Sequence, residues 1–375
     1  MKKLGFGTMR LPLLDSSDPT SIDMEQFCQM ADEFIQRGFT YFDTAYMYHN
    51  HKSEIAVREA VVKRHPRDQF TLASKLPMSM INSAEQQQTI FEEQLEKCGV
   101  DYFDYYLLHN LTKISYKKAE EFGSFAFAMQ KKAEGKVRHV GFSFHDEAAL
   151  LDEILTKHPE VEFVQLQLNY IDWDSQTIQS RACYEVCVKH NKPVVVMEPV
   201  KGGILVNSLP QKAKDLYEQA NPNMSVASWA VRFAASLDNV MMVLSGMSSL
   251  EQLQDNLSYM EEFQPLSEEE HATIQKVVGI LNESALVPCT ACAYCVEGCP
   301  MHIQIPKYFA AYNAVKQFGE KVLGNQRMYY NVSAEGNGKA SACIECGQCE
   351  RICPQHLPII KLLKDVAETF EEPAK

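Results

Sequence analysis

One arrangement of cysteines occurs twice near the C-terminus of this 375-residue chain, and it restricts the fold more than any other feature. In each copy, three cysteines are separated by two residues, and a fourth follows three residues later, directly before a proline. The first copy contains Cys289, Cys292, Cys295 and Cys299, and the second contains Cys343, Cys346, Cys349 and Cys353. In two-cluster proteins with this spacing, the three close thiolates bind one iron–sulfur cluster and the fourth binds the other.

The repeated pattern therefore predicts two [4Fe-4S] clusters, each with ligands from both copies. One predicted ligand set is Cys289, Cys292, Cys295 and Cys353, and the other is Cys343, Cys346, Cys349 and Cys299. Zinc and disulfide bonds are the alternatives. Zinc takes four ligands per site, and disulfide frameworks belong to small secreted domains, so the third closely spaced cysteine favours clusters. We expect the chain to transfer single electrons.

Composition limits the partners and the compartment. A hydrophobic fraction of 46% and a charged fraction of 23% are ordinary for a globular protein. The net charge of −13 argues against nucleic-acid binding. No apolar run has the length of a membrane helix, and the residues after Met1 lack the features of a signal peptide. We expect a cytoplasmic protein without a membrane partner. The four remaining cysteines, Cys28, Cys98, Cys183 and Cys187, are expected to be small core residues.

Before about residue 265, short β-rich runs alternate with amphipathic helical stretches. The predicted strands are residues 3–6, 39–42, 70–74, 103–108, 137–142, 163–166, 194–197 and 240–244, with helices that include 53–63, 84–98 and 116–134. Eight strand–helix units in this length predict an α/β fold, a (β/α)8 TIM barrel over residues 1–265. An open doubly wound sheet is the alternative, but no G-x-G-x-x-G turn follows the first strand.

Polar residues stand at matching positions of successive strand–helix units. Asp43, Lys75, His109 and Ser143 each lie at the end of a predicted strand, about one unit apart. Residues at this phase meet at the C-terminal mouth of a barrel, where barrel enzymes carry their active sites. Tyr48 lies in the loop after Asp43. Taken singly, these residues are explained by a helix cap, rim contacts or loop packing. Together they favour an acid–base site.

The tail forms a second region. Ser267 and the acidic residues after it predict the start of a helix, and we assign residues 266–286 to a connecting helix. Residues 287–375 are predicted to form a small, mainly helical cluster domain with helices over 305–323 and 357–370 and a loop over 334–338.

Several segments resemble the aldo/keto reductase family over roughly residues 1–260. They are Gly5-Phe6-Gly7-Thr8, Asp43-Thr44-Ala45 with Tyr48, Ser74-Lys75, Leu107-Leu108-His109, Gly141-Phe142-Ser143, Glu198-Pro199 with Gly202-Gly203, and Asp255-Asn256. The tail resembles the subgroup that carries a ferredoxin-like extension with two [4Fe-4S] clusters.

The resemblance implies hydride transfer from a nicotinamide to a small carbonyl substrate. Tyr48 would be the general acid, and His109 would orient the carbonyl group. A free tyrosine has a pKa near 10, and Lys75, held by Asp43, would lower the pKa of Tyr48.

The resemblance also implies a set of nicotinamide contacts. They are Gly7, Thr8, Met9, Ser143, Gln165, Met197, Pro199, Lys201, Gly202, Gly246, Gln252 and Asn256. Ser143 and Gln165 match the positions that hold the carboxamide, and Lys201 lies where the pyrophosphate would bind. Met197 replaces the usual stacking ring. Gly246 and Gln252 replace the Lys and Arg that many members use for the 2′-phosphate, so a preference for NADPH over NADH is not expected.

Three functions remain open. The barrel is a nicotinamide-dependent carbonyl reductase whose clusters exchange electrons with a separate redox partner; or its chemistry is driven by the clusters; or the tail is a structural or docking module. The first is favoured because the Asp43, Tyr48, Lys75 and His109 set is complete. Nicotinamide moves two electrons and a cluster moves one, so coupling them normally requires a flavin or a radical.

Overall fold

The structure, a computed structural model, describes residues 2–175, 178–282, 286–318, 320 and 323–371. The chain divides into two compact units. Unit 1 contains Met1–Val200 and Lys214–Gln275, and unit 2 contains Lys201–Ala213 and Lys276–Lys375. The expected boundaries after residues 265 and 286 stay predictions, and residues 283–285 lie outside the described part. The segment 201–213 was not expected to belong with the cysteine-rich region.

Unit 1 is a closed barrel of eight parallel strands, each hydrogen-bonded to its neighbours in chain order. The strands are β1 Leu4–Gly7, β2 Tyr41–Asp43, β3 Thr71–Pro77, β4 Phe103–Leu111, β5 Val137–Phe144, β6 Phe163–Gln167, β7 Val194–Met197 and β8 Val240–Ser245. All eight coincide with predicted strands, so the expected TIM barrel is confirmed.

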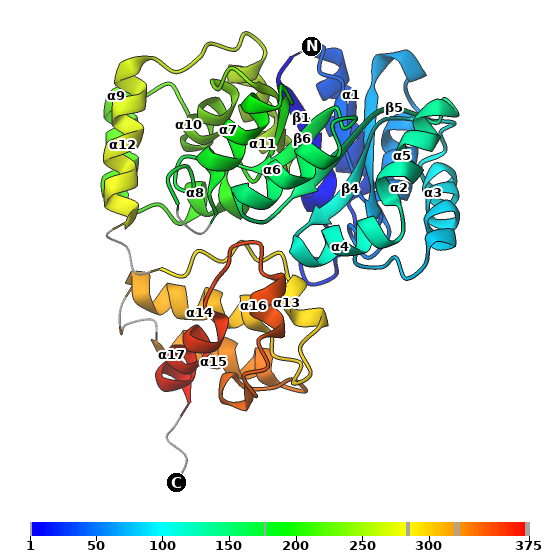
Figure 1. Ribbon diagram of the computed structural model, residues 1–375. Coiled ribbons are helices and arrows are strands. Elements are labelled where there is room, and N and C mark those ends of the chain that lie inside the picture. Colours follow the sequence, from blue (N-terminus) through cyan, green and yellow to red (C-terminus); the bar gives the residue numbers. More distant parts are fainter. Residues whose placement is uncertain (1, 176–177, 283–285, 319, 321–322, 372–375) are drawn as a thin grey trace. The chain divides into compact units, whose positions relative to one another are not determined.

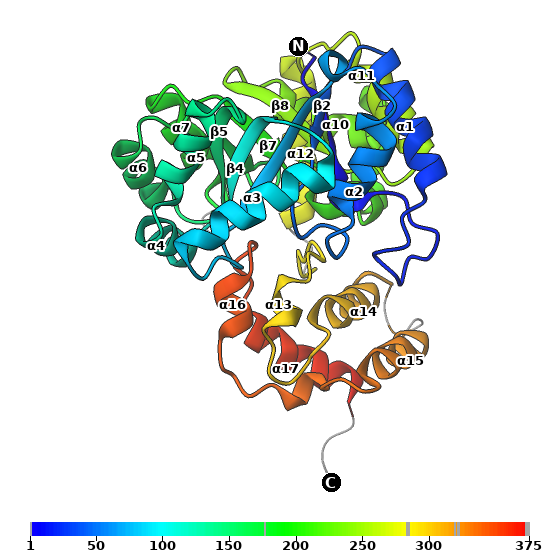
Figure 2. The same ribbon diagram turned by 90° about the vertical axis from the view of Figure 1, so that its right-hand side faces the viewer.

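Helices surround the strands (Figures 1 and 2). In unit 1 they are α1 Met24–Gln36, α2 Ser53–Val57, α3 Ala84–Cys98, α4 Lys113–Glu121, α5 Ser124–Ala133, α6 Ala148–Lys157, α7 Ser180–Lys189, α10 Val226–Ala235 and α11 Leu250–Met260. The helix α8 Ile204–Asn207 lies in unit 2, while α9 Gln211–Ala220 and α12 Glu268–Asn282 contain residues of both units.

Two predicted helices of unit 1 differ from the observed ones. The stretch 116–134 forms two helices, α4 and α5, because Gly123 adopts a left-handed conformation with φ 63° that an α-helix does not continue. The stretch 53–63 begins as α2 and continues as one π-helical turn, Arg58–Val62. The start of α12 follows the prediction: Ser267 Oγ accepts from the backbone N–H of Glu270, whose carboxylate accepts from the N–H of Ser267.

The barrel interior is built in layers. A buried apolar layer contains Tyr41, Ala73, Leu107, Phe163, Val195, Met242 and Leu244. Side chains of a strand alternate between its two faces, so residues two positions further along also point inward. For the first five members these residues are Asp43, Lys75, His109, Gln165 and Met197. The alternation thus places a polar layer above the apolar one, toward the C-terminal mouth.

Unit 2 is mainly helical. Its further helices are α13 Tyr294–Glu297, α14 Ile305–Phe318, α15 Leu323–Ala334, α16 Gln348–Ile352 and α17 Ile359–Phe370. The expected helix over 305–323 ends at Phe318 as α14, and residues 319, 321 and 322 of that prediction lie outside the described part. The expected loop over 334–338 begins where α15 ends.

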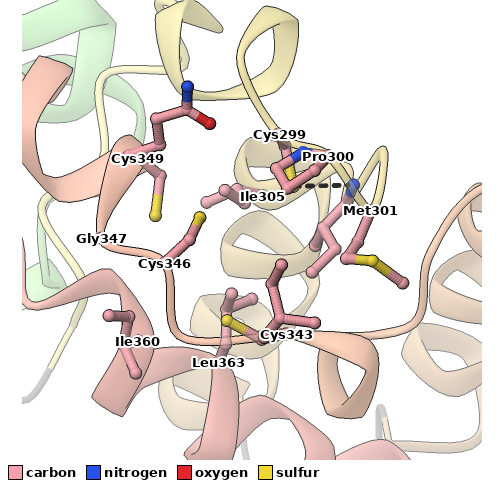
Figure 3. A pocket seen from close by; sticks show the side chains of 13 residues that line it. Cys299, Pro300, Met301, Ile305, Cys343, Cys346, Gly347, Cys349, Ile360 and Leu363 are labelled. Atoms are coloured by element: carbon pink, nitrogen blue, oxygen red, sulfur yellow. Dashed lines mark hydrogen bonds between the residues drawn. The ribbon is translucent and has the colours of Figure 1, made fainter.

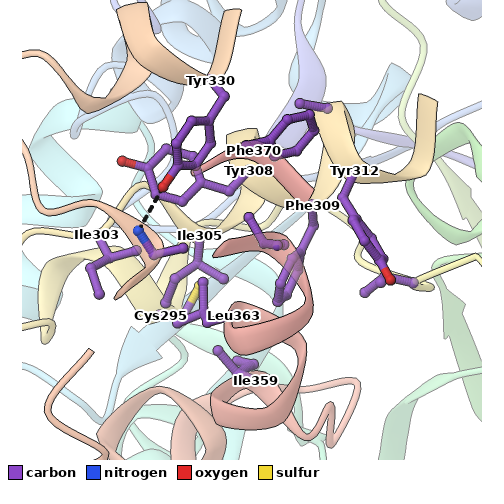
Figure 4. Packing of buried hydrophobic residues seen from close by; sticks show 14 of the residues in the cluster. Cys295, Ile303, Ile305, Tyr308, Phe309, Tyr312, Tyr330, Ile359, Leu363 and Phe370 are labelled. Carbon is purple, nitrogen blue, oxygen red and sulfur yellow. Dashed lines mark hydrogen bonds between the residues drawn. The ribbon is translucent and has the colours of Figure 1, made fainter. Parts of the chain in front are cut away.

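Aromatic packing joins three of these helices (Figure 4). Tyr330 of α15 lies between Tyr308 of α14 and Phe370 of α17, with ring centroids 4.6 and 5.1 Å away. The Tyr330 hydroxyl donates to the Glu371 carboxylate and accepts from the backbone N–H of Ala340. This core therefore fixes the backbone just before Cys343.

Two further expectations concern cysteines and membranes. Cys98, Cys183 and Cys187 are buried as expected, whereas Cys28 is half-buried. Across the described part of the chain, no helix is both long and apolar enough to cross a membrane.

Candidate functional site

Three predicted residues of the barrel mouth are in direct contact. The Lys75 amino group donates to Asp43 Oδ1 at 2.5 Å, to the carbonyl oxygen of Thr44 at 2.7 Å and to the Tyr48 hydroxyl oxygen at 3.5 Å. The side chains of Lys75 and Asp43 are 0% and 3% exposed. A buried ion pair that is also hydrogen-bonded is held in one geometry, so Lys75 is fixed beneath Tyr48.

The pKa of Tyr48 differs from the sequence-based expectation. Burial raises the pKa of Tyr48 well above its ordinary value, and the negative charges of Asp43 and Glu198 add to the rise, while Arg10 opposes it. The sequence predicted that Lys75 lowers the pKa of Tyr48. The positive charge of Lys75 is instead balanced by Asp43, so burial has the largest effect on the pKa of Tyr48. Tyr48 is therefore a protonated phenol at neutral pH, able to donate a proton.

His109 lies beside Tyr48. The two rings are 5.9 Å apart between centroids and nearly perpendicular. Burial lowers the pKa of His109 well below its ordinary value, and Lys75 and His145 lower it further. His109 is therefore neutral at neutral pH. A neutral imidazole carries one N–H donor, which suits the orientation of a carbonyl oxygen.

A buried network behind Lys75 was not predicted. Glu54 of α2 accepts hydrogen bonds from Ser74 at 2.7 Å and from Gln94 at 2.8 Å, and Gln94 also donates to the backbone oxygen of Lys75. Burial raises the pKa of Glu54 to about 7. Burial lowers the pKa of Lys75, and the charge of Asp43 and, less strongly, that of Glu54 oppose this effect. The only sequence signal was an acidic residue next to the apolar stretch of a helix.

An ion pair at the mouth was also missed. Arg10, in the turn after β1, lies 3.5 Å from the Glu198 carboxylate after β7. The stem of Arg10 also covers Gly246: a Cβ at position 246 would stand 3.4 Å from the Cβ of Arg10. The positively charged Arg10 therefore lies beside Gly246, the position at which many family members carry a cation and this chain does not. The loops after strands seven and eight often bind phosphate in TIM barrels.

The predicted carboxamide contacts lie side by side. Ser143 and Gln165 are paired in the register of β5 and β6, and both are buried. Ser143 Oγ accepts from the backbone N–H of Asn110 at 2.7 Å, so its own hydroxyl proton can be donated. Gln165 donates to the sulfur of Met197 at 3.5 Å. Within the described part of the chain, Gln165 Oε1 has no hydrogen-bond partner.

Other predicted nicotinamide contacts lie around β1 and β8. The Thr8 hydroxyl donates to the backbone oxygen of Asp43, and Gly7 is packed against the backbone of Ser245. Gln252 accepts from the N–H of Ser248, while Asn256 donates to the backbone oxygen of Gln252. Asn256 Oδ1 is buried and has no hydrogen-bond partner among the residues described. The buried oxygens of Gln165 and Asn256 fit a ligand that brings N–H donors, as a nicotinamide dinucleotide does.

The remaining predicted contacts divide between the units. Met9 and Pro199 belong to unit 1, whereas Lys201 and Gly202 belong to unit 2. The Lys201 amino group donates to Gln355 Oε1 at 2.7 Å. A role of Lys201 and Gly202 at a pyrophosphate stays a prediction.

The cysteines of unit 2 line two cavities. One cavity is lined by Cys289, Cys292, Cys295 and Cys353, and the other by Cys299, Cys343, Cys346 and Cys349 (Figure 3). Apolar side chains complete both, with Ile305 shared between them. In the described residues, no three Cys, His, Asp or Glu side chains converge around a single-ion position. Four thiols around a cavity fit the multi-atom core of a [4Fe-4S] cluster.

Comparisons with known proteins agree with both regions. The family model "Aldo/keto reductase family" matches residues 3–278, and the model "4Fe-4S dicluster domain" matches residues 288–357. "Uncharacterized oxidoreductase YqkF" of Bacillus subtilis is 23% identical over 73% of this chain and 92% of its own length. "NADH-specific methylglyoxal reductase" of Escherichia coli is 23% identical over 59% of this chain and 78% of its own length.

A soybean protein, "Probable aldo-keto reductase 1", is 27% identical, but the match spans about half of each chain, 46% and 49%. Among solved structures, an aldo-keto reductase of Klebsiella pneumoniae in complex with NADPH is similar with a TM-score of 0.59 and 22% identity. The similarity covers 74% of this chain and 90% of that one. A holo-form aldo-keto reductase of Bacillus halodurans gives a TM-score of 0.56 with 24% identity, over 73% and 91% of the two chains. These identities support the fold.

Proposed function

Because this chain belongs to the aldo/keto reductase family and carries a 4Fe-4S dicluster domain, we propose that its barrel reduces a small aldehyde or ketone to the alcohol with NAD(P)H. The chain is an oxidoreductase of the aldo/keto reductase type. The observation that carries the specific proposal is the contact set at the barrel mouth, where buried Lys75 joins Asp43 to the hydroxyl of Tyr48 and the ring of His109 packs against the ring of Tyr48.

Bound NAD(P)H supplies a hydride to the carbonyl carbon. Tyr48 gives its hydroxyl proton to the carbonyl oxygen, which completes the alcohol. Lys75 stabilises the phenolate that remains, because its amino group already faces the Tyr48 oxygen. Asp43 keeps that amino group in place. Neutral His109 donates its N–H to the carbonyl oxygen and so orients the substrate.

Residues of the chain are available to hold the cofactor in position. Ser143 and Gln165 would hold the nicotinamide carboxamide, because one has a free hydroxyl proton and the other a buried oxygen open to a donor. Asn256 offers a second such oxygen. Arg10 would supply positive charge near the dinucleotide phosphates. We leave NADH and NADPH as equal candidates, since Gly246 and Gln252 carry no charge.

In unit 2 the eight cysteines would hold two [4Fe-4S] clusters, each set drawn from both cysteine copies. Apolar walls around both cavities support this proposal, because they would shield the clusters from water. Bound clusters exchange single electrons. We therefore propose a separate redox partner protein. A thiolate-held cluster pair suits a reducing compartment, which favours the cytoplasm.

The decisive test of the carbonyl reductase proposal is Tyr48→Phe. Removal of a general acid lowers turnover by about 100-fold or more, while the affinity for NAD(P)H should stay nearly unchanged. Turnover would be followed with a panel of aldehydes and ketones, and cofactor affinity by direct titration.

Tyr46→Phe is the matched control for this test. It removes a hydroxyl from the same loop, one that donates to Glu93, and it should leave turnover within about threefold because this hydroxyl is bonded to Glu93 and has no part in the proposed proton transfer. Full turnover in Tyr48→Phe would refute the assignment of the general acid.

A further inference from the structure

A buried lysine stands beside the cavity formed by Cys289, Cys292, Cys295 and Cys353. Lys201 is 3% exposed, and its amino group donates to Gln355 Oε1 at 2.7 Å. Gln355 is itself 6% exposed, lines this cavity and follows the predicted ligand Cys353 by two positions. The lysine therefore brings a positive charge to the wall of one predicted cluster site.

The backbone before α8 holds this lysine in an unusual conformation. Lys201, Gly202 and Gly203 all have positive φ, of 48°, 65° and 92°. A non-glycine residue persists in this region only where its surroundings impose it, and such residues concentrate at functional sites. Lys201 and its partner Gln355 both belong to unit 2. The conformation places Lys201 in contact with Gln355.

The second cavity has different charges around it. Lys364 forms an ion pair with Glu345, and the two side chains are 60% and 55% exposed. Arg351, which donates to the backbone oxygen of Cys346, is exposed as well. Water and salt weaken the effect of exposed charges, whereas a buried charge acts through a medium of low dielectric constant. The two cavities are therefore electrostatically unequal.

Reduction adds one negative charge to a [4Fe-4S] cluster, and nearby positive charge stabilises the reduced state. Net charge and hydrogen bonds around a cluster are among the factors that set its reduction potential.

We propose that Lys201, held by Gln355, makes the cluster bound by Cys289, Cys292, Cys295 and Cys353 the higher-potential cluster of the two. Electrons that enter unit 2 then reside on this cluster. Lys201 acts as a positioning residue that tunes a cluster, in place of the pyrophosphate contact expected from the sequence. The inference rests on the proposed ligand sets.

The test is an anaerobic redox titration of the full chain, followed by electron paramagnetic resonance, after iron and sulfide have been counted in each sample. Lys201→Gln should make reduction of the higher-potential cluster at least tenfold less favourable. For one electron, this corresponds to a fall of about 59 mV in its reduction potential. The lower potential should stay the same. Lys212→Gln removes an exposed lysine of the same segment and should change neither potential. Lys201→Arg keeps the positive charge, so its higher reduction potential should stay close to that of the parent protein.

Two further variants complete the test. Cys346→Ser alters the other cluster and so identifies which transition belongs to it. Gln355→Glu adds a negative charge two positions from Cys353 and should lower the same potential that Lys201→Gln lowers. If Lys201→Gln loses iron, the potential measured in Gln355→Glu tests the inference in its place.

Three results would overturn the inference. Unchanged potentials in Lys201→Gln with full iron and sulfide would remove the role of Lys201, and a loss of NAD(P)H affinity in that sample would assign Lys201 to the pyrophosphate instead. If Lys201→Gln shifts the same transition that Cys346→Ser alters, Lys201 acts on the other cluster, and the inference is wrong. Absence of iron and sulfide from the parent protein would refute the ligand sets themselves, and this inference with them.

Discussion

At the scale of single residues, the buried carboxyl of Glu54 links stability to pH. Burial raises its pKa from the ordinary value of 4.5 to about 7, so the folded protein holds the proton more tightly than the unfolded chain does. The stability that comes from this raised pKa is fully present below about pH 4.5 and is lost as the pH rises through about 7.

Glu54→Gln should remove this pH dependence. The free energy of unfolding of the parent should fall between pH 4.5 and 7 with a contribution of up to about 1.4 kcal/mol per pH unit from this one group, and the variant should lack that contribution. Urea unfolding at a series of pH values measures it. Glu92→Gln, at an exposed position of α3, should keep the parent slope. An identical slope in Glu54→Gln would show that Glu54 does not titrate in this range.

We expect Arg10 to contribute to how tightly the barrel binds each cofactor. It is the cation that lies over Gly246, where the sequence itself offers none. We expect NADH and NADPH to bind the parent within about tenfold of each other. Arg10→Met should weaken binding of NADPH by about 10- to 100-fold, the range expected for a lost charge-assisted hydrogen bond.

Direct titration of both cofactors against the parent, Arg10→Met and Arg10→Lys measures this discrimination. Arg10→Lys keeps the charge without the planar guanidinium and should fall between the other two proteins. A strong preference for NADPH that survives in Arg10→Met would contradict the expectation.

At the scale of elements, the contact between β5 and β6 leaves room for no side chain at Gly141. A Cβ there would stand 2.6 Å from the Phe163 ring and 2.7 Å from the Phe163 carbonyl oxygen. Gly141→Ala should therefore destabilise the barrel by about 1–3 kcal/mol, the usual effect of overpacking.

Gly279→Ala in α12 provides a control of opposite sign. A Cβ at Gly279 meets nothing within 4 Å, so the substitution should stabilise the helix by about 0.5–1 kcal/mol. Urea unfolding of both variants compares them. Equal effects of the two substitutions would show that the close approach at Gly141 is relieved by movement of β6.

The same scale explains which elements could be predicted. The eight strands follow from β-rich runs that alternate with helical stretches, because this alternation is local and repeats. The break between α4 and α5 could not be predicted in the same way. A single glycine is tolerated within many helices, and the left-handed conformation of Gly123 is visible only in the tertiary structure.

At the scale of the whole molecule, the question is whether electrons from the barrel reach the clusters. Hydride carries two electrons and each cluster accepts one. If the barrel and the clusters are electrically connected, anaerobic addition of NADH to the full chain should bleach the visible absorbance of the clusters within the time of a few turnovers.

Tyr48→Phe separates the possible routes of this reduction. Bleaching should persist in the variant, because the role proposed for Tyr48 is to protonate a carbonyl group, and that step is not required for removal of a hydride from the cofactor. Carbonyl reduction by the parent without any bleaching would favour clusters that serve structure or docking.

The sequence by itself determined the barrel and predicted which cysteines would line each cavity, since both depend on spacing along the chain. Asp43, Lys75 and His109 lie about one strand–helix unit apart, and this spacing predicted that they meet at the barrel mouth. Only the tertiary structure decided their electrostatics. The raised pKa of Tyr48 depends on burial and on charges from distant segments. The contact of Arg10 with Gly246 and that of Lys201 with Gln355, 154 positions further along the chain, could not be predicted either. Contacts between distant segments arise from packing that no local sequence pattern encodes.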